Sequence, residues 1–561
     1  MNKFIRGVYK FIRGAYLFLL LGLLGTGQVQ AQKKSTKLNR PKLVVGIVVD
    51  QMRYDYLYRY WDKYGEDGFK RLLLSGFSYE NTHYNYVPTY TGPGHASIYT
   101  GTTPAIHGIV GNDWYDRTTA LNRYCAEDKN VNSVGSTSVW GQMSPKNLLT
   151  TTITDQLRLA TNMQAKVIGV CIKDRGAILP AGHTANAAYW YDGTNGDWIT
   201  STFYMDALPA WVQAFNARKL SEKYLSQAWT PLLPLAAYTE STPDDNEFEK
   251  PFAGEERPVF PHDLARLRGT SFDILRSTPF GNTFTKDFAI ETIRAEKMGK
   301  GRVTDFLALS FSATDYVWHQ FGPNSIEAQD TYLRLDQDLA LLLKFLDAEL
   351  GKNQYLVFLT ADHGAAPVPA YSQSLRVPAG SIAPQEMQDS VQQFLQQQYG
   401  PGNWVLSFIN RQLYLNHALL AAKKLNVADM ADKIGAYLQH FEGVRQVTTA
   451  SNLSGGSQDS GLDSYIQRGL QPQRSGDVIV TLLPGWFEGY QGKEMKGTTH
   501  GSSNAYDTHV PLVWYGWQVK KGASSARVSI TDIAPTLAQW LRILEPNGNT
   551  GTPLLEVLNR R

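Results

Sequence analysis

Leu43-Val-Val-Gly-Ile-Val-Val49 is a continuous run of apolar, mostly β-branched residues, and Asp50 follows it directly. Such a run is typical of a strand that is buried on both faces of a parallel sheet. Similar runs occur at 166–172, 305–311 and 354–360, and helical patterns separate them. This alternation predicts an α/β fold, a three-layer α/β/α sandwich with helices on both faces of the sheet.

Further elements extend the pattern along the chain. Helical patterns cover 54–75, 152–163, 326–350 and 530–544, and strand patterns cover 477–483 and 509–514. The alternation is lost between about 200 and 300, where Pro, Gly, Asp and Glu are frequent, and again between about 370 and 475. The predicted order is a signal peptide at 1–31, a catalytic core at 32–200, 301–370 and 476–561, a cap or lid insertion at 201–300, and a small α+β insertion at 371–475.

The N-terminus resembles a secretory signal. Lys3, Arg6, Lys10 and Arg13 precede an apolar run of ten residues, 15–24, and 29–31 offers a small-x-small cleavage site. The run is short for a membrane span, so we predict cleavage and a periplasmic or secreted protein without stable membrane insertion; an uncleaved anchor is the alternative. Removal of these four cations changes the formal net charge from +3 to −1. This charge indicates no nucleic-acid partner, and we expect a monomer.

The chain contains only two cysteines, Cys125 and Cys171. Export permits a disulfide between them, but the sequence does not show that their Cα atoms are close, so both the bridged and the free forms stay open. Two cysteines provide neither a disulfide framework nor a cysteine-based metal site.

The segment from Tyr86 to Thr102 contains Thr91-Gly-Pro-Gly-His95. Its glycines and Pro93 predict a tight turn, and a helix is predicted from His95 onward. Thr91 then lies at or beside the N-cap, where free N–H groups and the helix dipole favour an anionic oxygen. This position suits an alkoxide and the phosphate that it attacks, although an ordinary capping threonine explains the motif better when it is taken alone.

Three aspartates follow the C-terminal ends of predicted core strands, and a histidine lies beside one of them: Asp50, Asp315, Asp362 and His363. In parallel α/β sheets these strand ends share one edge, where ligands bind. His319 is four residues beyond Asp315, so both point the same way on a helical turn, and His500 comes from a Gly-rich loop. The sequence therefore predicts three carboxylates and three imidazoles at one edge.

Each of these residues has an ordinary explanation when it is taken singly. An aspartate at a strand end usually caps a loop, and a lone histidine is usually packed or solvated. Together, the carboxylates would repel one another unless a cation lies among them. A mixed Asp/His set favours zinc, with manganese as the alternative.

The motifs together resemble those of the alkaline phosphatase superfamily, in its phosphodiesterase-like branch with a threonine nucleophile. The matching motifs, in chain order, are Thr91-Gly-Pro-Gly-His95, Asp315-x-x-x-His319, Asp362-His363-Gly364 and His500-Gly501. Three further features are similar to the Bacteroidetes periplasmic alkaline phosphatases: Asp50-Gln-Met-Arg-Tyr54, Asn112 and Lys173-x-Arg175. The resemblance covers nearly the whole chain beyond the signal, and no catalytic position departs from it.

The resemblance implies two zinc ions and a role for each matching residue. One zinc is expected to bind Asp315, His319 and His500, and the other Asp50, Asp362, His363 and Thr91. The phosphate oxygens are expected to contact Asn112, Lys173 and Arg175. The positive charge of two Zn²⁺ ions is cancelled by the negative charges of three aspartates and a Thr91 alkoxide. The two positive charges of Lys173 and Arg175 then match the two negative charges of a phosphate monoester. A surface basic pair is the ordinary explanation of these two cations.

We therefore predict a zinc-dependent alkaline phosphatase that hydrolyses phosphate monoesters through a phospho-threonine intermediate. A phosphodiesterase or nucleotide pyrophosphatase on the same scaffold is the alternative, and it needs an apolar or nucleoside-binding groove in place of the two cations. A non-catalytic zinc-binding surface protein is a further alternative. A sulfatase is excluded at Cys171-Ile-Lys-Asp-Arg175, because this segment lacks the proline of the sulfatase motif.

Overall fold

The computed structural model describes residues 39–453, 460–489 and 495–558. The predicted signal peptide at 1–31 lies outside the described residues. Among the described ranges, no helix has the length and apolar character needed to cross a membrane.

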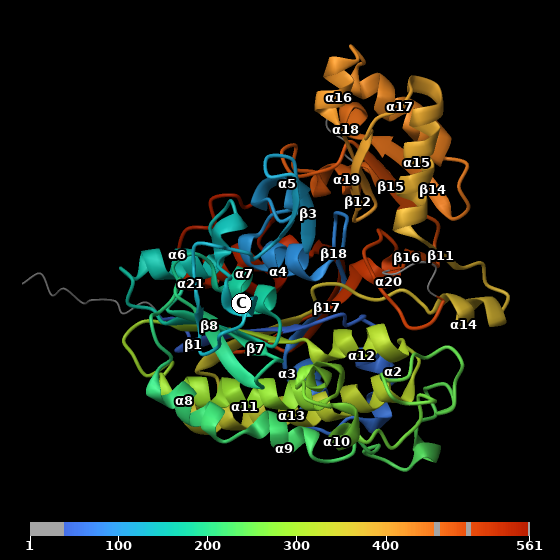
Figure 1. The fold of residues 1–561 in the computed structure, drawn as a ribbon. Coiled ribbons are helices and arrows are strands. Elements are labelled where there is room, and N and C mark those ends of the chain that lie inside the picture. The colour runs from blue at the N-terminus through green and yellow to red at the C-terminus, as the bar shows by residue number, and fades with distance from the viewer. Residues whose placement is uncertain (1–38, 454–459, 490–494, 559–561) are drawn as a thin grey trace, which may run out of the picture. The chain divides into compact units, whose positions relative to one another are not determined.

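A ten-stranded mixed sheet forms the centre of the fold (Figure 1). Its strands are, in spatial order, β18 (Gly522–Ser529), β2 (Phe77–His83), β17 (His509–Gly516), β10 (Tyr355–Thr360), β1 (Leu43–Val49), β9 (Asp305–Phe311), β6 (Val167–Cys171), β7 (Ala187–Asp192), β8 (Asp197–Ser201) and β5 (Ser133–Val134). The five strands from β10 to β7 are parallel, and β17 and β8 run antiparallel to them. Every residue of β1, β9 and β10 is buried, as their largely apolar sequences predicted.

Helices cover both faces of this sheet, which confirms the predicted three-layer arrangement (Figure 1). One layer contains α4 (Thr91–Thr100), α6 (Ile153–Ala160), α7 (Asp174–Ala181) and α21 (Ile533–Leu541). The other contains α8 (Ala210–Ala217), α9 (Leu220–Leu225), α11 (Phe280–Ala295), α12 (Ala313–Phe321) and α13 (Ile326–Leu350). One hydrophobic cluster joins the sheet to residues of α8, α11 and α13. The segment 201–300 therefore supplies part of a helical layer, while its predicted role as a lid stays a prediction.

A four-stranded antiparallel sheet belongs to a second, smaller hydrophobic cluster. Its strands, in spatial order, are β12 (Val405–Ile409), β13 (Gln412–Leu415), β15 (Val478–Leu482) and β14 (Val444–Thr449). Helices α15 (Pro384–Tyr399), α16 (His417–Ala422) and α17 (Val427–Leu438) complete this cluster. The prediction that the strand at 477–483 returns to the main sheet is wrong, because β15 pairs with β13 and β14. An apolar run identifies a buried strand but not the sheet that it joins.

The long helix predicted over 54–75 is also wrong. The structure has α2 (Tyr56–Arg59), a 3₁₀ turn at Trp61–Lys63 and α3 (Phe69–Ser75). Asp336 on α13 accepts hydrogen bonds from the N–H groups of Gly65, at 2.8 Å, and Phe69, at 2.7 Å. This distant carboxylate holds the chain in a loop between the helices and caps α3.

A buried acidic cluster lies beside the first turn of α13. Glu327 and Glu249 are both buried, and His262 lies 3.2 Å from Glu327 and 2.9 Å from Glu255. Neither carboxylate oxygen of Glu249 accepts a hydrogen bond in the described part of the chain. Burial, and then the charge of Glu327, raises the pKa of Glu249 from 4.5 to about 11. Glu249 in the folded protein therefore stays protonated at pH values well above 4.5, whereas the same residue in the unfolded chain loses its proton there.

Glu249→Gln should stabilise the protein increasingly as the pH rises. Because the folded state of the wild type retains this proton, its free energy of unfolding falls by up to about 1.4 kcal/mol per pH unit between the unfolded and the folded pKa. Glutamine keeps the neutral form and removes this dependence. Urea unfolding at pH 6, 7.5 and 9 measures the difference, with the more exposed Glu222→Gln as the control. A difference that stays constant with pH would show that Glu249 is ionised in the fold.

Candidate active site

Four charged side chains lie at the C-terminal edge of the parallel strands. Asp50 follows β1, Lys173 follows β6, Asp362 follows β10, and Asp315 lies in the first turn of α12, directly after β9. Because β10, β1, β9 and β6 are adjacent and parallel, these ends meet at one edge. The topology thus brings together residues that are up to 312 positions apart in the sequence.

Thr91 begins helix α4, four residues earlier than predicted. Its neighbours fit the first helical turn because N–H groups there need no intrahelical partner, so Pro93 loses no hydrogen bond. Gly94 is required by packing: a Cβ atom there would lie 2.3 Å from the carbonyl oxygen of Asp362. The absence of this side chain lets α4 approach the end of β10 and places Thr91, which is buried, in the site.

Three histidines present their Nε2 atoms to this edge: His319, His363 and His500. Each Nδ1 atom faces a backbone carbonyl, which can only accept a hydrogen bond, so Nδ1 carries the proton and Nε2 is left with a lone pair. The carbonyl groups are those of Thr498 at 2.7 Å, Gly364 at 2.9 Å and Thr89 at 2.7 Å, respectively. Burial lowers the pKa of His363 and His500, which keeps both rings neutral and able to bind a metal.

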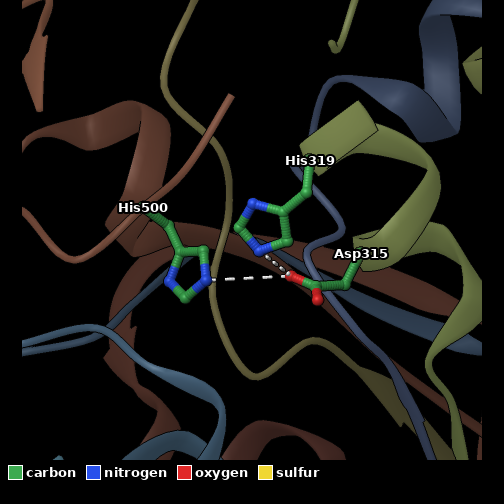
Figure 2. A group of neighbouring side chains, drawn as sticks. All are labelled: Asp315, His319 and His500. Carbon is green, nitrogen blue, oxygen red and sulfur yellow. Dashed lines mark ion pairs between the residues drawn. The ribbon is translucent and has the colours of Figure 1, made fainter. Parts of the chain in front are cut away.

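The first candidate metal group is Asp315, His319 and His500, as predicted. The Nε2 atoms of His319 and His500 lie 3.1 and 3.7 Å from Oδ1 of Asp315. Figure 2 shows both imidazole rings directed at this carboxylate. One ligand atom from each residue lies within 4.8 Å of the others, so a single ion could be held by all three.

The second candidate group centres on His363. Its Nε2 atom lies 3.6 Å from Oδ1 of Asp50, 3.5 Å from Oδ2 of Asp362 and 3.5 Å from Oγ1 of Thr91. The four residues predicted for this position are therefore brought together. The three side chains with ligand atoms within 4.8 Å of one another are Asp50, Asp315 and His363, so Asp315 lies between the two groups.

The residues present fit a bound cation. Oδ1 of Asp50 and Oδ2 of Asp362 are buried and accept no hydrogen bond in the described part of the chain. Burial, and then the charge of Asp362, raises the pKa of Asp50 well above its ordinary value. A divalent cation would relieve this repulsion, and the mixed carboxylate and imidazole donors are those that zinc takes.

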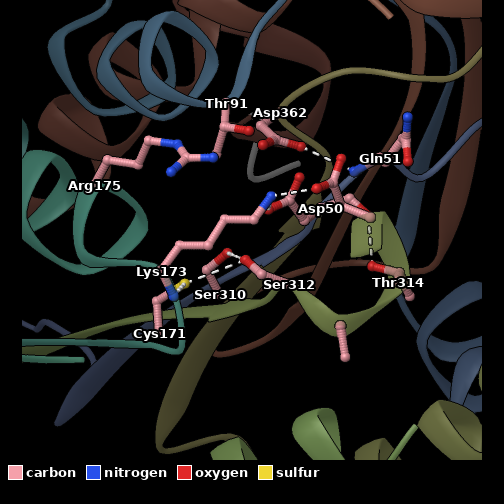
Figure 3. Close-up of polar contacts among 12 residues, drawn as sticks. Asp50, Gln51, Thr91, Cys171, Lys173, Arg175, Ser310, Ser312, Thr314 and Asp362 are labelled. Carbon is pink, nitrogen blue, oxygen red and sulfur yellow. Dashed lines mark hydrogen bonds and ion pairs between the residues drawn. The ribbon is translucent and has the colours of Figure 1, made fainter. Parts of the chain in front are cut away.

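Lys173 makes ion pairs that the sequence did not predict, and its predicted contact with phosphate oxygens stays a prediction. Its Nζ lies 2.8 Å from Oδ2 of Asp50 and 2.5 Å from Oδ2 of Asp315, and Figure 3 shows it reaching Asp50. Burial lowers its pKa, but the two carboxylates outweigh this effect and raise it, so Lys173 is charged. The ammonium group therefore neutralises part of the acidic cluster.

Arg175 and Asn112 flank Thr91. The Nη1 atom of Arg175 donates a hydrogen bond to the hydroxyl of Tyr124 at 3.0 Å, and Figure 3 shows its guanidinium directed toward Thr91. Oδ1 of Asn112 accepts a hydrogen bond from the N–H of Gly92 at 2.8 Å. The Nδ2 group of Asn112 is therefore the part that can donate to a ligand.

Several positioning contacts were not predicted. Nδ1 of His95 donates to the carbonyl of Thr91 at 2.9 Å and lies 3.3 Å from Oδ2 of Asp362. Its Nε2 atom lies 2.9 Å from the hydroxyl of Ser310 on β9. His95 was visible as the last residue of the Thr91 motif, but its partners come from distant strands. Tyr124 had no sequence signal.

Both cysteines are free and buried, so the structure contains the unbridged form of Cys125 and Cys171. Sγ of Cys171 lies 3.2 Å from the hydroxyl of Ser312. A Cβ atom added at Gly92 would lie 3.1 Å from Sγ of Cys125. The two thiols thus pack against different segments next to the site.

Known proteins resemble this chain over most of its length. The type I phosphodiesterase / nucleotide pyrophosphatase family matches residues 44–503. A protein of Myroides odoratus named "Calcium-transporting ATPase" is 49% identical over 94% of this chain and 96% of its own length. "Alkaline phosphatase PafA" of Elizabethkingia meningoseptica is 45% identical, and the match covers 96% of this chain and 99% of the relative.

The fold comparison agrees with these matches. A crystal structure of wild-type alkaline phosphatase PafA superposes with a TM-score of 0.90 at 45% identity, and it covers 93% of this chain and 100% of that one. The predictions of the fold and of a phosphatase that hydrolyses phosphate esters are confirmed. The chain belongs to the type I phosphodiesterase / nucleotide pyrophosphatase family of the alkaline phosphatase superfamily.

Proposed function

We propose that this protein is an exported, zinc-dependent alkaline phosphatase that hydrolyses phosphate monoesters through a phospho-threonine at Thr91. The observation that carries the proposal is the position of the Thr91 hydroxyl, 3.5 Å from Nε2 of His363 at the start of a helix. A hydroxyl among buried carboxylates and neutral imidazoles has the surroundings of an activated nucleophile. The basic and apolar N-terminal pattern supports export.

Asp315, His319 and His500 would hold one zinc ion, and Asp50, Asp362, His363 and Thr91 the other. When bound, zinc supplies Lewis-acid stabilisation of charge on the attacking and departing oxygens. Thr91 Oγ1 gives its proton to solvent and bonds to phosphorus, while the bond from phosphorus to the alcohol oxygen breaks on the opposite side and the departing oxygen takes a proton from solvent. Water then attacks the phospho-threonine: its oxygen and one proton leave with hydrogen phosphate, the bond from phosphorus to Oγ1 breaks, and the other proton restores the Thr91 hydroxyl. His95 fixes the position of Thr91 relative to Asp362, because its Nδ1 atom contacts both residues.

Asn112 and Arg175 supply N–H donors beside the nucleophile, and we assign them to the nonbridging oxygens of the phosphate. Charge-assisted hydrogen bonds from such donors strengthen as negative charge shifts during transfer. Lys173 adds a positive charge next to Asp50 and Asp315. Arg175 and Lys173 together favour a dianionic monoester over a monoanionic diester.

A paired substrate test separates the monoesterase from its alternative. Lys173→Ala/Arg175→Ala should lower kcat/KM for p-nitrophenyl phosphate by roughly two to four orders of magnitude if the contributions add. The loss for the methyl diester of the same compound should be much smaller, because the diester carries one negative charge fewer. Both substrates are measured in the wild type, each single variant and the double variant. Equal losses on both substrates would assign the two cations to structure or to general phosphate binding.

The family description favours a second candidate, a phosphodiesterase or nucleotide pyrophosphatase. The Myroides relative adds ATP as a compound to test, because its name attributes an ATPase activity to that protein. Purified wild-type protein should hydrolyse p-nitrophenyl phosphate with a higher kcat/KM than the methyl diester. Its kcat/KM for p-nitrophenyl sulfate should be the lowest of the three. A higher value for the diester, or for cleavage of ATP between its α- and β-phosphates, would favour the second candidate.

A further inference from the structure

The small four-stranded sheet reaches the candidate active site through one hairpin turn. Strands β12 and β13 pair Ile409 with Gln412, so Asn410 and Arg411 alone form the turn between them. Both side chains of the turn donate hydrogen bonds to segments that carry proposed site residues. The insertion that contains this hairpin is therefore connected directly to the site.

The backbone of the turn does not explain its sequence. Asn410 and Arg411 have φ angles of 56° and 58°, and a two-residue hairpin turn with two positive φ values is typical of Asn-Gly. Asparagine tolerates this conformation, but an arginine is strained at the position where glycine is usual. A residue held in such a conformation points to a role for its side chain.

The Arg411 side chain lies against two neighbours of His500. It is only 6% exposed, and its Nη2 atom donates a hydrogen bond to the carbonyl of Gly501, which directly follows His500. A Cβ atom at Gly501 would lie 2.6 Å from this nitrogen, so the contact requires glycine there. The guanidinium carbon also lies 6.0 Å from the centre of the Tyr90 ring, which packs edge-on to His500 with 5.3 Å between ring centres. Arg411 thus supports both the backbone after His500 and the ring beside it.

The Asn410 side chain lies against the loop that carries Asn112. Its Nδ2 atom donates a hydrogen bond to the carbonyl of Asp113 at 2.6 Å. A Cβ atom at Gly111 would lie 2.3 Å from the same nitrogen, so Asn410 packs closely on both neighbours of Asn112. The Asn112 side chain in turn holds the N–H of Gly92, beside the nucleophile. A change at Asn410 would therefore displace Asn112.

We infer that Asn410 and Arg411 are positioning residues for the reaction. Arg411 fixes the loop that presents His500, and Asn410 fixes the loop that presents Asn112. The inference rests on the proposed function, in which His500 holds zinc and Asn112 contacts the phosphate. The small sheet thus supports the site through its hairpin turn, and neither residue needs to touch the reacting atoms.

The role of Arg411 is tested by zinc affinity. Arg411→Gly should shift one step of zinc binding to a free zinc concentration about tenfold higher, because His500 loses the support of its neighbour. Glycine suits the turn, so the hairpin itself should be retained. Elemental analysis after equilibrium dialysis against a series of buffered zinc concentrations gives the occupancy.

Two further variants control this experiment. Lys424→Gly is the matched control, since Lys424 is an exposed cation of the same insertion with a φ of 59°, and its zinc affinity should equal that of the wild type. Arg411→Met keeps an apolar stem but donates no hydrogen bond, so it should show the same shift as Arg411→Gly. It also provides the test if the glycine variant does not fold.

The role of Asn410 is tested by a double-mutant cycle at saturating zinc. Asn410→Gly should lower kcat/KM for p-nitrophenyl phosphate by about three- to tenfold in the wild type. It should have almost no further effect in Asn112→Ala, because its influence passes through the side chain that this variant lacks. A general loss of stability would instead lower kcat/KM equally in both backgrounds.

The two experiments separate this inference from the proposed function. Unchanged zinc affinity in Arg411→Gly and Arg411→Met would overturn the role of Arg411, and equal losses in the two backgrounds would overturn that of Asn410. A wild type that binds no zinc, or does not hydrolyse p-nitrophenyl phosphate, would overturn the proposed function and this inference with it.

Discussion

Replacement of Thr91 by alanine should lower kcat/KM for p-nitrophenyl phosphate by several orders of magnitude. The variant loses the atom that bonds to phosphorus, while the neighbouring carboxylates and imidazoles keep their positions. Thr91→Ser retains a hydroxyl at the start of α4 and should keep a good part of the rate. Steady-state kinetics of the two variants, with circular dichroism to compare their folding, measure this difference.

Thr89 provides a matched control two residues away. Its hydroxyl donates to the carbonyl of Ser502 at 3.0 Å, and its own carbonyl accepts from His500. Thr89→Ala keeps the carbonyl and loses one ordinary hydrogen bond, so its kcat/KM should stay within about tenfold of the wild type. A larger loss in Thr89→Ala than in Thr91→Ala would mean that the nucleophile has been misassigned.

Loss of a metal ligand should remove metal and activity together. His500→Ala and Asp362→Ala each delete a buried side chain that we propose as a zinc ligand. We therefore expect both variants to bind less than the two zinc ions predicted for the wild type and to lose nearly all activity. Elemental analysis of the purified proteins gives the zinc content, and His440→Ala, which changes an exposed histidine outside both groups, is the control. Full activity after exhaustive chelation would exclude a metal-dependent reaction.

Much of the site could be predicted because strand ends and motifs are local signals. The apolar runs of β1 and β9 have the predicted bounds, so Asp50 and Asp315 could be placed at the edge of the sheet before the structure was known. The spacing of Asp315 and His319 also indicated a shared helical face. His500 has no such strand beside it, and its predicted place depended on its Gly-rich loop and on the motif resemblance.

The features that were missed depend on partners far away in the sequence. The loop at Gly65 is held by Asp336, and Lys173 is drawn to Asp50 and Asp315 by charge. The start of α4 at Thr91 depends on close packing of Gly94 against Asp362. Local patterns contain no information about which distant carboxylate or carbonyl approaches a residue, so these contacts required the fold.

The central claim is that the phosphoryl group passes through Thr91, and trapping the intermediate tests it most directly. The wild type is mixed with ³²P-labelled p-nitrophenyl phosphate and quenched at low pH, and peptides from the denatured protein are analysed by mass spectrometry. We expect one phosphate on Thr91, within the peptide that spans 86–102, and no label on the Thr91→Ala protein. Phosphate on Thr89 or on another residue, or hydrolysis at the wild-type rate by Thr91→Ala, would contradict the account.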